Sequence, residues 1–171
     1  MPAGVVLDTS FLITLADPKR PQHKTARQYW RHFLAQRLPI YLPTIVVSEF
    51  CIKQPIPPEI LRACVVLPFN WSDALKAAEL DFTKAGRGRE SRVALKDDVK
   101  IIAQGIVKDA AWIITDDAES LYKFAARLKG GGPSKMQPIK LEDGFDLSHL
   151  DPARQHTIAF DTPPEETDAE G

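Results

Sequence analysis

The chain of 171 residues contains only two cysteines, Cys51 and Cys64, and their spacing matches no metal-binding or redox motif. A scaffold held by several disulfides is therefore excluded. Both cysteines lie among apolar residues, so we expect two buried free thiols in a reducing cytoplasm. The four histidines also lack the spacing of metal ligands. Neither residue type is expected to take part in the chemistry of this protein.

Long hydrophobic runs are also missing, since the longest apolar stretch is far too short to cross a bilayer. The first residues lack the basic segment that precedes the core of a secretory signal. We therefore expect a cytoplasmic protein with no membrane partner. Hydrophobic residues make up 44% of the chain and charged residues 26%, as in ordinary globular domains. A chain of this length most simply forms one domain around one core.

Charge is distributed unevenly along the chain. Residues 142–171 hold nine acids and one arginine, which gives this segment a net charge of −8 and leaves +7 on residues 1–141. The composition predicts a folded domain over 1–141 and an acidic, flexible tail over 142–171. Phe145, Leu147 and Leu150 leave open a docking of the tail on the body or on a partner. The positive body suits a polyanionic partner, although basic residues also occur on any solvated surface.

Apolar segments of two kinds alternate along the chain. Short β-branched runs predict strands at 5–7, 40–42, 65–67 and 112–115, with an edge strand within 133–141. Helical spacing predicts helices at 11–15, 21–37, 44–50, 59–64 and 119–129, with two more that begin at 71 and 97. Thr44 is the expected N-cap of its helix. Strands that alternate with helices indicate an α/β fold whose parallel sheet is covered on both faces.

Acidic residues recur where these strands end or these helices begin. Asp8 follows the buried run Val5–Leu7, at the strand end where open α/β sheets place their ligands. A buried carboxylate there is costly unless it is paired or bound to a cation. The other acids of this kind are Glu49, Asp97, Asp98, Asp116 and Asp117. Several carboxylates in one place suit Mg²⁺ or Mn²⁺, and such ions activate water for displacement at phosphorus.

Each acid also has a purely structural interpretation. Asp8 and Asp117 could cap helices, and Asp98 could complement the dipole of a helix that starts at Asp97. The spacing of the acids cannot show by itself that they converge. The repetition at strand ends favours a shared site.

Four segments carry a resemblance to a known family: LDTSFL at the start, TIVVSEF around Glu49, KDDVKIIAQ, and IITDDAESLYKFA. Together they resemble the acidic motifs of the PIN-domain family of metal-dependent ribonucleases, which includes the VapC-type toxins. The resemblance covers residues 4–141. It implies a three-layer α/β/α sandwich with a mainly parallel sheet, a Mg²⁺ or Mn²⁺ cofactor, cleavage of RNA, and the possibility of an antitoxin partner and a homodimer.

Matched position by position, the resemblance implies that Asp8, Glu49, Asp98 and Asp117 bind the metal and carry the catalysis. Asp97 and Asp116 remain alternatives for the last two positions, because each motif holds a doublet. Ser10 and Thr115 either orient a carboxylate or cap a helix. The basic loop at 84–96 either holds substrate phosphates or is simply solvated.

Three hypotheses follow. The first is a metal-dependent endoribonuclease, which could be the toxin of a toxin–antitoxin pair. The second is a catalytically degenerate module of the same fold that binds RNA or protein. The third is a phosphoryl-transfer enzyme with an aspartyl nucleophile, and it is disfavoured because Ser10 stands where such enzymes carry a second acid.

Overall fold

The fold is organised around β1 (Val5–Leu7), the central strand of a five-stranded sheet. The computed structural model describes residues 3–80, 91–131 and 134–151. The sheet order is β3-β2-β1-β4-β5, and every described pairing is parallel. The other strands are β2 (Ile40–Pro43), β3 (Val65–Leu67), β4 (Trp112–Thr115) and β5 (Gln137–Lys140). The expected parallel sheet and its edge strand are therefore confirmed.

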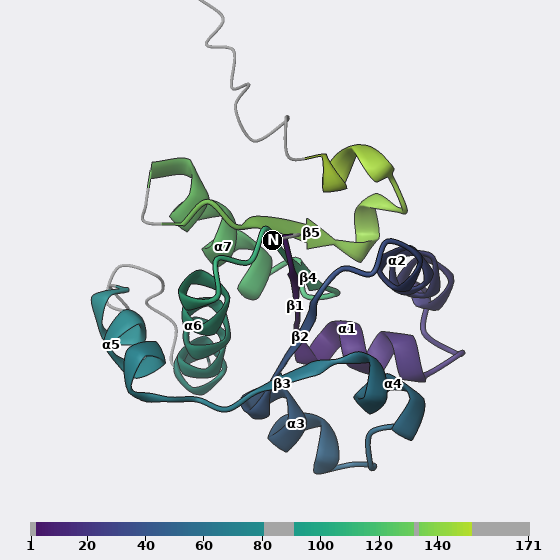
Figure 1. Ribbon diagram of the computed structural model, residues 1–171, viewed down its shortest axis with the longest axis horizontal. Helices are drawn as coiled ribbons and strands as arrows, with labels where there is room; N and C mark the ends of the chain where they lie inside the picture. Colours follow the sequence, from purple (N-terminus) through teal and green to yellow (C-terminus); the bar gives the residue numbers. More distant parts are fainter. Residues whose placement is uncertain (1–2, 81–90, 132–133, 152–171) are drawn as a thin grey trace, which may run out of the picture.

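Helices cover both faces of this sheet (Figure 1). One face carries α1 (Thr9–Ala16), α2 (His23–Ala35) and α4 (Pro58–Ala63). The opposite face carries α5 (Trp71–Glu79), α6 (Ser91–Val107) and α7 (Leu121–Gly131). The remaining helix, α3 (Thr44–Cys51), follows β2 and contacts both α1 and α6. This arrangement is the three-layer α/β/α sandwich expected from the sequence.

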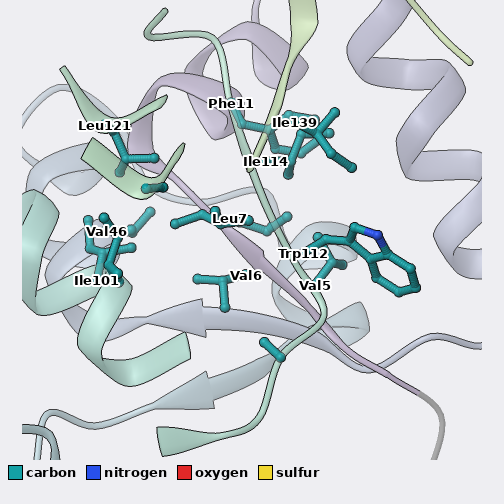
Figure 2. Close-up of a cluster of buried hydrophobic side chains, with 14 of the residues drawn as sticks. Val5, Val6, Leu7, Phe11, Val46, Ile101, Trp112, Ile114, Leu121 and Ile139 are labelled. Carbon is teal, nitrogen blue, oxygen red and sulfur yellow. The ribbon is translucent and has the colours of Figure 1, made fainter. Parts of the chain in front are cut away.

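The core forms where the apolar run of β1 meets both helical layers. Val5, Val6 and Leu7 are fully buried, because both of their neighbouring strands and both faces are covered. Figure 2 shows these side chains packed with residues of α1, β4 and α6, among them Phe11, Ile114 and Ile101. The central strand is thus held rigidly up to Leu7, the residue that precedes Asp8.

Gly4, at the entry to β1, lies against an aromatic ring. A Cβ atom at Gly4 would stand 2.2 Å from Cε2 of Tyr41 and 3.0 Å from the carbonyl oxygen of Pro39. The Gly4 carbonyl also accepts hydrogen bonds from the N–H groups of Ala111 and Trp112, so the backbone is fixed on both sides. The position therefore has no room for a side chain.

We predict that Gly4→Ala destabilises the protein by about 1–3 kcal/mol, the usual cost of overpacking. The melting temperature should fall by about 3–10 °C in a thermal unfolding experiment. The Tyr41→Ala background is the control, because removal of the ring should suppress most of this loss. An equal loss in both backgrounds would contradict the proposed contact.

The largest departure from the sequence interpretation is the start of α6. Helix α6 begins at Ser91, whereas the sequence analysis placed its start at Asp97. The segment after Gly88 contains no glycine or proline until Gly105, so a helix that has formed there propagates at little cost. Asp97 and Asp98 therefore lie well inside the helix and not in its first turn. The helix dipole does not explain Asp98.

Three smaller expectations were also wrong. Thr44 is the first helical residue of α3, and Pro43 occupies the N-cap position. Cys51 is exposed, because it lies at the end of α3 on the side away from the core, and Cys64 is half-buried. Helix α7 begins at Leu121, since residues 117–120 form a turn that Asp117 holds together.

The chain remains ordered past residue 141, where the predicted flexible tail was expected to begin. Two short 3₁₀ helices follow, η2 (Leu141–Asp143) and η3 (Leu147–Leu150). The Phe145 ring packs edge-on against Tyr29 with 4.9 Å between centroids, and the Tyr29 hydroxyl donates to the Gly144 carbonyl oxygen over 3.1 Å. Residues 142–151 therefore pack on α2. The rest of the predicted tail, 152–171, lies outside the described residues.

Candidate functional site

The carboxyl ends of β1 and β4 bring two acidic segments side by side. The two strands are paired in register, with Leu7 opposite Ile114, and the ladder extends to a bond from the Asp8 N–H to the Ile114 carbonyl oxygen. Asp8 follows β1 directly, and Asp117 follows β4 after one intervening residue. The central pairing of the sheet thus places both acids at one edge.

Asp8 is buried, with 4% of its surface exposed. It caps α1, since its side chain accepts a hydrogen bond from the Ser10 N–H. The same Oδ2 atom accepts from the Ser10 hydroxyl at 2.5 Å and from the Thr115 hydroxyl at 2.8 Å. Burial raises the pKa of Asp8 above its ordinary value, and these hydrogen bonds only partly offset the increase. Asp8 is therefore both a helix cap and a costly buried acid.

The hydroxyl groups of Ser10 and Thr115 join the two strand ends. Besides contacting Asp8, the Ser10 Oγ accepts from the Asp116 N–H at 2.8 Å. The Thr115 Oγ1 accepts from the Asp117 N–H at 2.9 Å. Of the two roles left open by the sequence, orientation of a carboxylate is the one that both hydroxyls perform. They also fix the turn that carries Asp117.

Glu49 reaches the same edge from α3. It is half-buried, and the Thr9 hydroxyl donates a hydrogen bond to its Oε2. Burial raises the pKa of Glu49, and the negative charges of Asp8 and Asp97 raise it further. Glu49 therefore lies within electrostatic range of Asp8, although the two residues come from different segments.

Asp98 and Asp117 are joined through one hydroxyl group. The Ser120 Oγ lies 2.7 Å from Oδ2 of Asp98 and 2.7 Å from Oδ2 of Asp117. Burial raises the pKa of Asp98 to about 7, and the charges of Asp8, Asp117 and Glu49 contribute to this shift. For Asp117, burial is outweighed by the Ser120 hydroxyl and by backbone N–H groups, so its pKa is lowered. The two neighbouring acids therefore have pKa values that are shifted in opposite directions.

The second members of the two acidic doublets have other partners. Oδ1 of Asp97 lies 3.0 Å from the Lys100 ammonium group, although the charge of Asp97 still acts on Glu49. Asp116 accepts a hydrogen bond from the Thr14 hydroxyl at 2.6 Å. Neither residue is among the groups that raise the pKa of Asp98. The contacts therefore favour Asp98 and Asp117 over Asp97 and Asp116 as members of the cluster.

The four predicted acids, Asp8, Glu49, Asp98 and Asp117, thus approach one another from four segments of the chain. In the described part of the chain, however, no three His, Cys, Asp or Glu side chains are close enough to enclose a metal ion as they stand. The acids act on one another through their charges, and their nearest polar contacts are hydroxyl groups. We refer to these four residues below as the acidic cluster.

The sequence analysis assigned no role at the site to two contributing hydroxyl residues, Thr9 and Ser120. Each follows a cluster acid closely in the sequence, Thr9 by one position and Ser120 by three. A search for hydroxyl residues beside each acid would have found both. Of the basic loop predicted at 84–96, residues 84–90 lie outside the described residues. Residues 91–96 are the first turns of α6 and not a loop, and Lys96 is exposed there.

The fold and this edge define an α/β protein with its polar cluster at the carboxyl ends of parallel strands, where ligands of such folds bind. No protein-family model matches the sequence, and no curated protein matches it. Among solved structures the chain is similar to one described as "Crystal structure of DNA bound VapBC from Salmonella typhimurium". The two chains are 14% identical, with a TM-score of 0.53 over 81% of this chain and 98% of the other. This similarity concerns the fold alone.

Proposed function

We propose that this protein is a metal-dependent endoribonuclease of the PIN-like type and that the acidic cluster is its active site. The observation that carries the proposal is the meeting of four carboxylates from four segments at one edge, where three of them have a raised pKa. Burying mutually repelling acids lowers the stability of a protein, and such clusters of perturbed acids are typical of functional sites.

The donor set fits a hard divalent cation, because every side chain of the acidic cluster offers carboxylate oxygen. Asp8, Glu49, Asp98 and Asp117 would hold Mg²⁺ or Mn²⁺, which supplies an activated water and offsets charge at phosphorus. Ser10 and Thr115 would keep the Asp8 carboxylate in place, and Ser120 would do the same for Asp98 and Asp117. The Lys100 ammonium group pairs with Asp97, and its positive charge also acts on Glu49 and partly offsets the rise in the pKa of that residue.

RNA as substrate, an antitoxin protein as partner and a homodimer are parts of the same proposal. They rest on the acidic motifs described above and on the fold shared with a VapBC structure. Such a toxin would act in the cytoplasm. In the described residues no helix is both long enough and apolar enough to span a bilayer.

A second candidate is a degenerate module of the same fold that binds RNA or protein without cleavage. The separation of the acids favours it, since no group of three in the described residues is ready to enclose an ion. It predicts that the protein binds RNA equally well with and without metal and never cuts it.

The two candidates are separated by incubating end-labelled single-stranded RNA with the protein in Mg²⁺, in Mn²⁺ and in EDTA. The nuclease proposal predicts cleavage products with either metal and none in EDTA, because the proposed metal ion supplies the activated water. Binding of Mn²⁺, followed by its electron paramagnetic resonance signal, is the parallel measurement. Intact RNA in both metals would contradict the proposed nuclease activity. Cleavage in excess EDTA would contradict the proposed dependence on a metal ion.

A further inference from the structure

Helix α2 has a strongly basic outer face. Lys24, Arg27 and Arg31 are exposed, and their spacing of three and four residues puts them on one side of the helix. The helix contains no aspartate or glutamate. The buried face opposite is formed by Ala26, Tyr29 and Phe33. The outer face therefore presents three positive charges and no negative one.

These three side chains have no acidic partner among the residues that the structure describes. The acidic segment 142–151 lies nearby, because Phe145 and His149 both contact Tyr29. Tyr29 is on the buried face of α2, so this segment packs along the flank of the helix. Asp143 pairs with Lys140. Within the described residues, therefore, no acid neutralises the basic face of α2.

The N-terminal end of the basic face is linked to the acidic cluster through a chain of hydrogen bonds. At the start of α2, Nδ1 of His23 lies 3.0 Å from the Thr14 carbonyl oxygen. The Thr14 hydroxyl in turn donates to Asp116, whose neighbour Asp117 belongs to the cluster. Lys24 therefore lies at the end of α2 nearest the site, and Arg31 lies two turns away, about 10 Å along the helix.

We propose that this face of α2 binds the phosphate backbone of a single-stranded RNA that extends from the acidic cluster. A row of about 10 Å matches roughly three phosphates of one strand. Lysine and arginine contacts to phosphate supply affinity and register without reading sequence. The choice of RNA as the strand rests on the proposed function, whereas binding of the strand requires neither metal nor cleavage.

The test compares wild type with the triple variant Lys24→Gln, Arg27→Gln, Arg31→Gln by fluorescence anisotropy of a labelled single-stranded RNA in EDTA. We expect a loss of affinity of about tenfold or more. The slope of log affinity against log salt concentration should fall by about 2, since each lost contact contributes about 0.7 on a single strand. Circular dichroism confirms that these exposed substitutions leave the fold intact.

The matched control is Lys53→Gln, Arg62→Gln, Lys108→Gln, which removes the same charge from exposed positions elsewhere. It should change affinity less than about threefold. An equal loss of RNA affinity in both triple variants would show that the loss comes from the change in net charge. Unchanged affinity in the α2 variant would show that RNA does not bind this face and would favour an acidic protein as its partner. Either result overturns the proposal. If the α2 variant binds weakly but wild type fails to cut RNA in Mg²⁺, the surface stands and the nuclease proposal alone fails.

Discussion

Asp8→Asn is expected to lower the rate of metal-dependent RNA cleavage by at least about 100-fold. This effect is larger than the one expected when a residue that only supports a metal ligand is removed. The substitution keeps the size of the side chain and an oxygen that can accept from the Ser10 N–H. It removes the negative charge that the proposed metal needs, at the most buried acid of the cluster. The rate of cleavage of labelled RNA in saturating Mn²⁺ is the measurement.

The folded state of this variant should survive. Burial raises the pKa of Asp8, so the ionised carboxylate is itself destabilising in the metal-free protein. The matched control is Asp116→Asn, because the Asp116 side chain is hydrogen-bonded to Thr14 and is not among the groups that shift the pKa of Asp8 or Asp98. The control should keep activity within about threefold. Full activity of Asp8→Asn, or equal losses in the two variants, would remove Asp8 from the active site.

Asp98→Asn is expected to make the metal-free protein more stable at pH 8, by about 1–3 kcal/mol. The pKa of Asp98 rises from 3.8 to about 7 on folding, chiefly because of burial. Such a shift costs at most about 4 kcal/mol above pH 7, and the partial exposure of the side chain reduces the effect. Asparagine avoids this cost and can donate from its amide to Ser120. Chemical unfolding in EDTA measures the difference.

The pH dependence follows from the direction of the shift. Between about pH 4 and pH 7 folded Asp98 keeps a proton that the unfolded chain has released, so stability contributed by this residue falls as pH rises. The difference between Asp98→Asn and wild type should therefore be near zero at pH 4 and complete above pH 7. Asp8 and Glu49 shift in the same direction, and Asp117 shifts in the opposite direction.

Mn²⁺ should reverse the ranking of the two proteins. A ligand that binds only the folded state stabilises it, and wild type has the full set of carboxylates to bind the ion. Asp98→Asn should gain less stability from millimolar Mn²⁺ and lose cleavage activity. A variant that is less stable than wild type in EDTA would show that Asp98 has an ordinary structural role.

Much of the fold could be predicted because its strands are short, apolar and separated by helices of clear spacing. Val5–Leu7 has no polar side to offer water, which fixes it as a central strand. The exact start of α6 could not be predicted, since the residues before Asp97 are basic and follow two glycines, a composition that loops share. Local helix propensity does not decide between a helix and a loop there.

For the acidic cluster, the sequence indicated which acids end strands but not which of two adjacent acids turns inward. Adjacent residues in a helix point about 100° apart, so Asp97 and Asp98 differ through the three-dimensional position of α6. Likewise, Asp116 differs from Asp117 because its side chain is held by Thr14, which comes from a distant part of the chain. Contacts of this kind depend on the assembled fold.

The attachment of η3 to Tyr29 determines what lies beside the basic face of α2. His149 lies 2.8 Å from the Tyr29 hydroxyl, and the Phe145 ring packs on the same residue. This contact is intramolecular, so it is governed by a local effective concentration and not by the amount of protein. The flank of α2 next to the basic face therefore stays covered at any dilution of the protein.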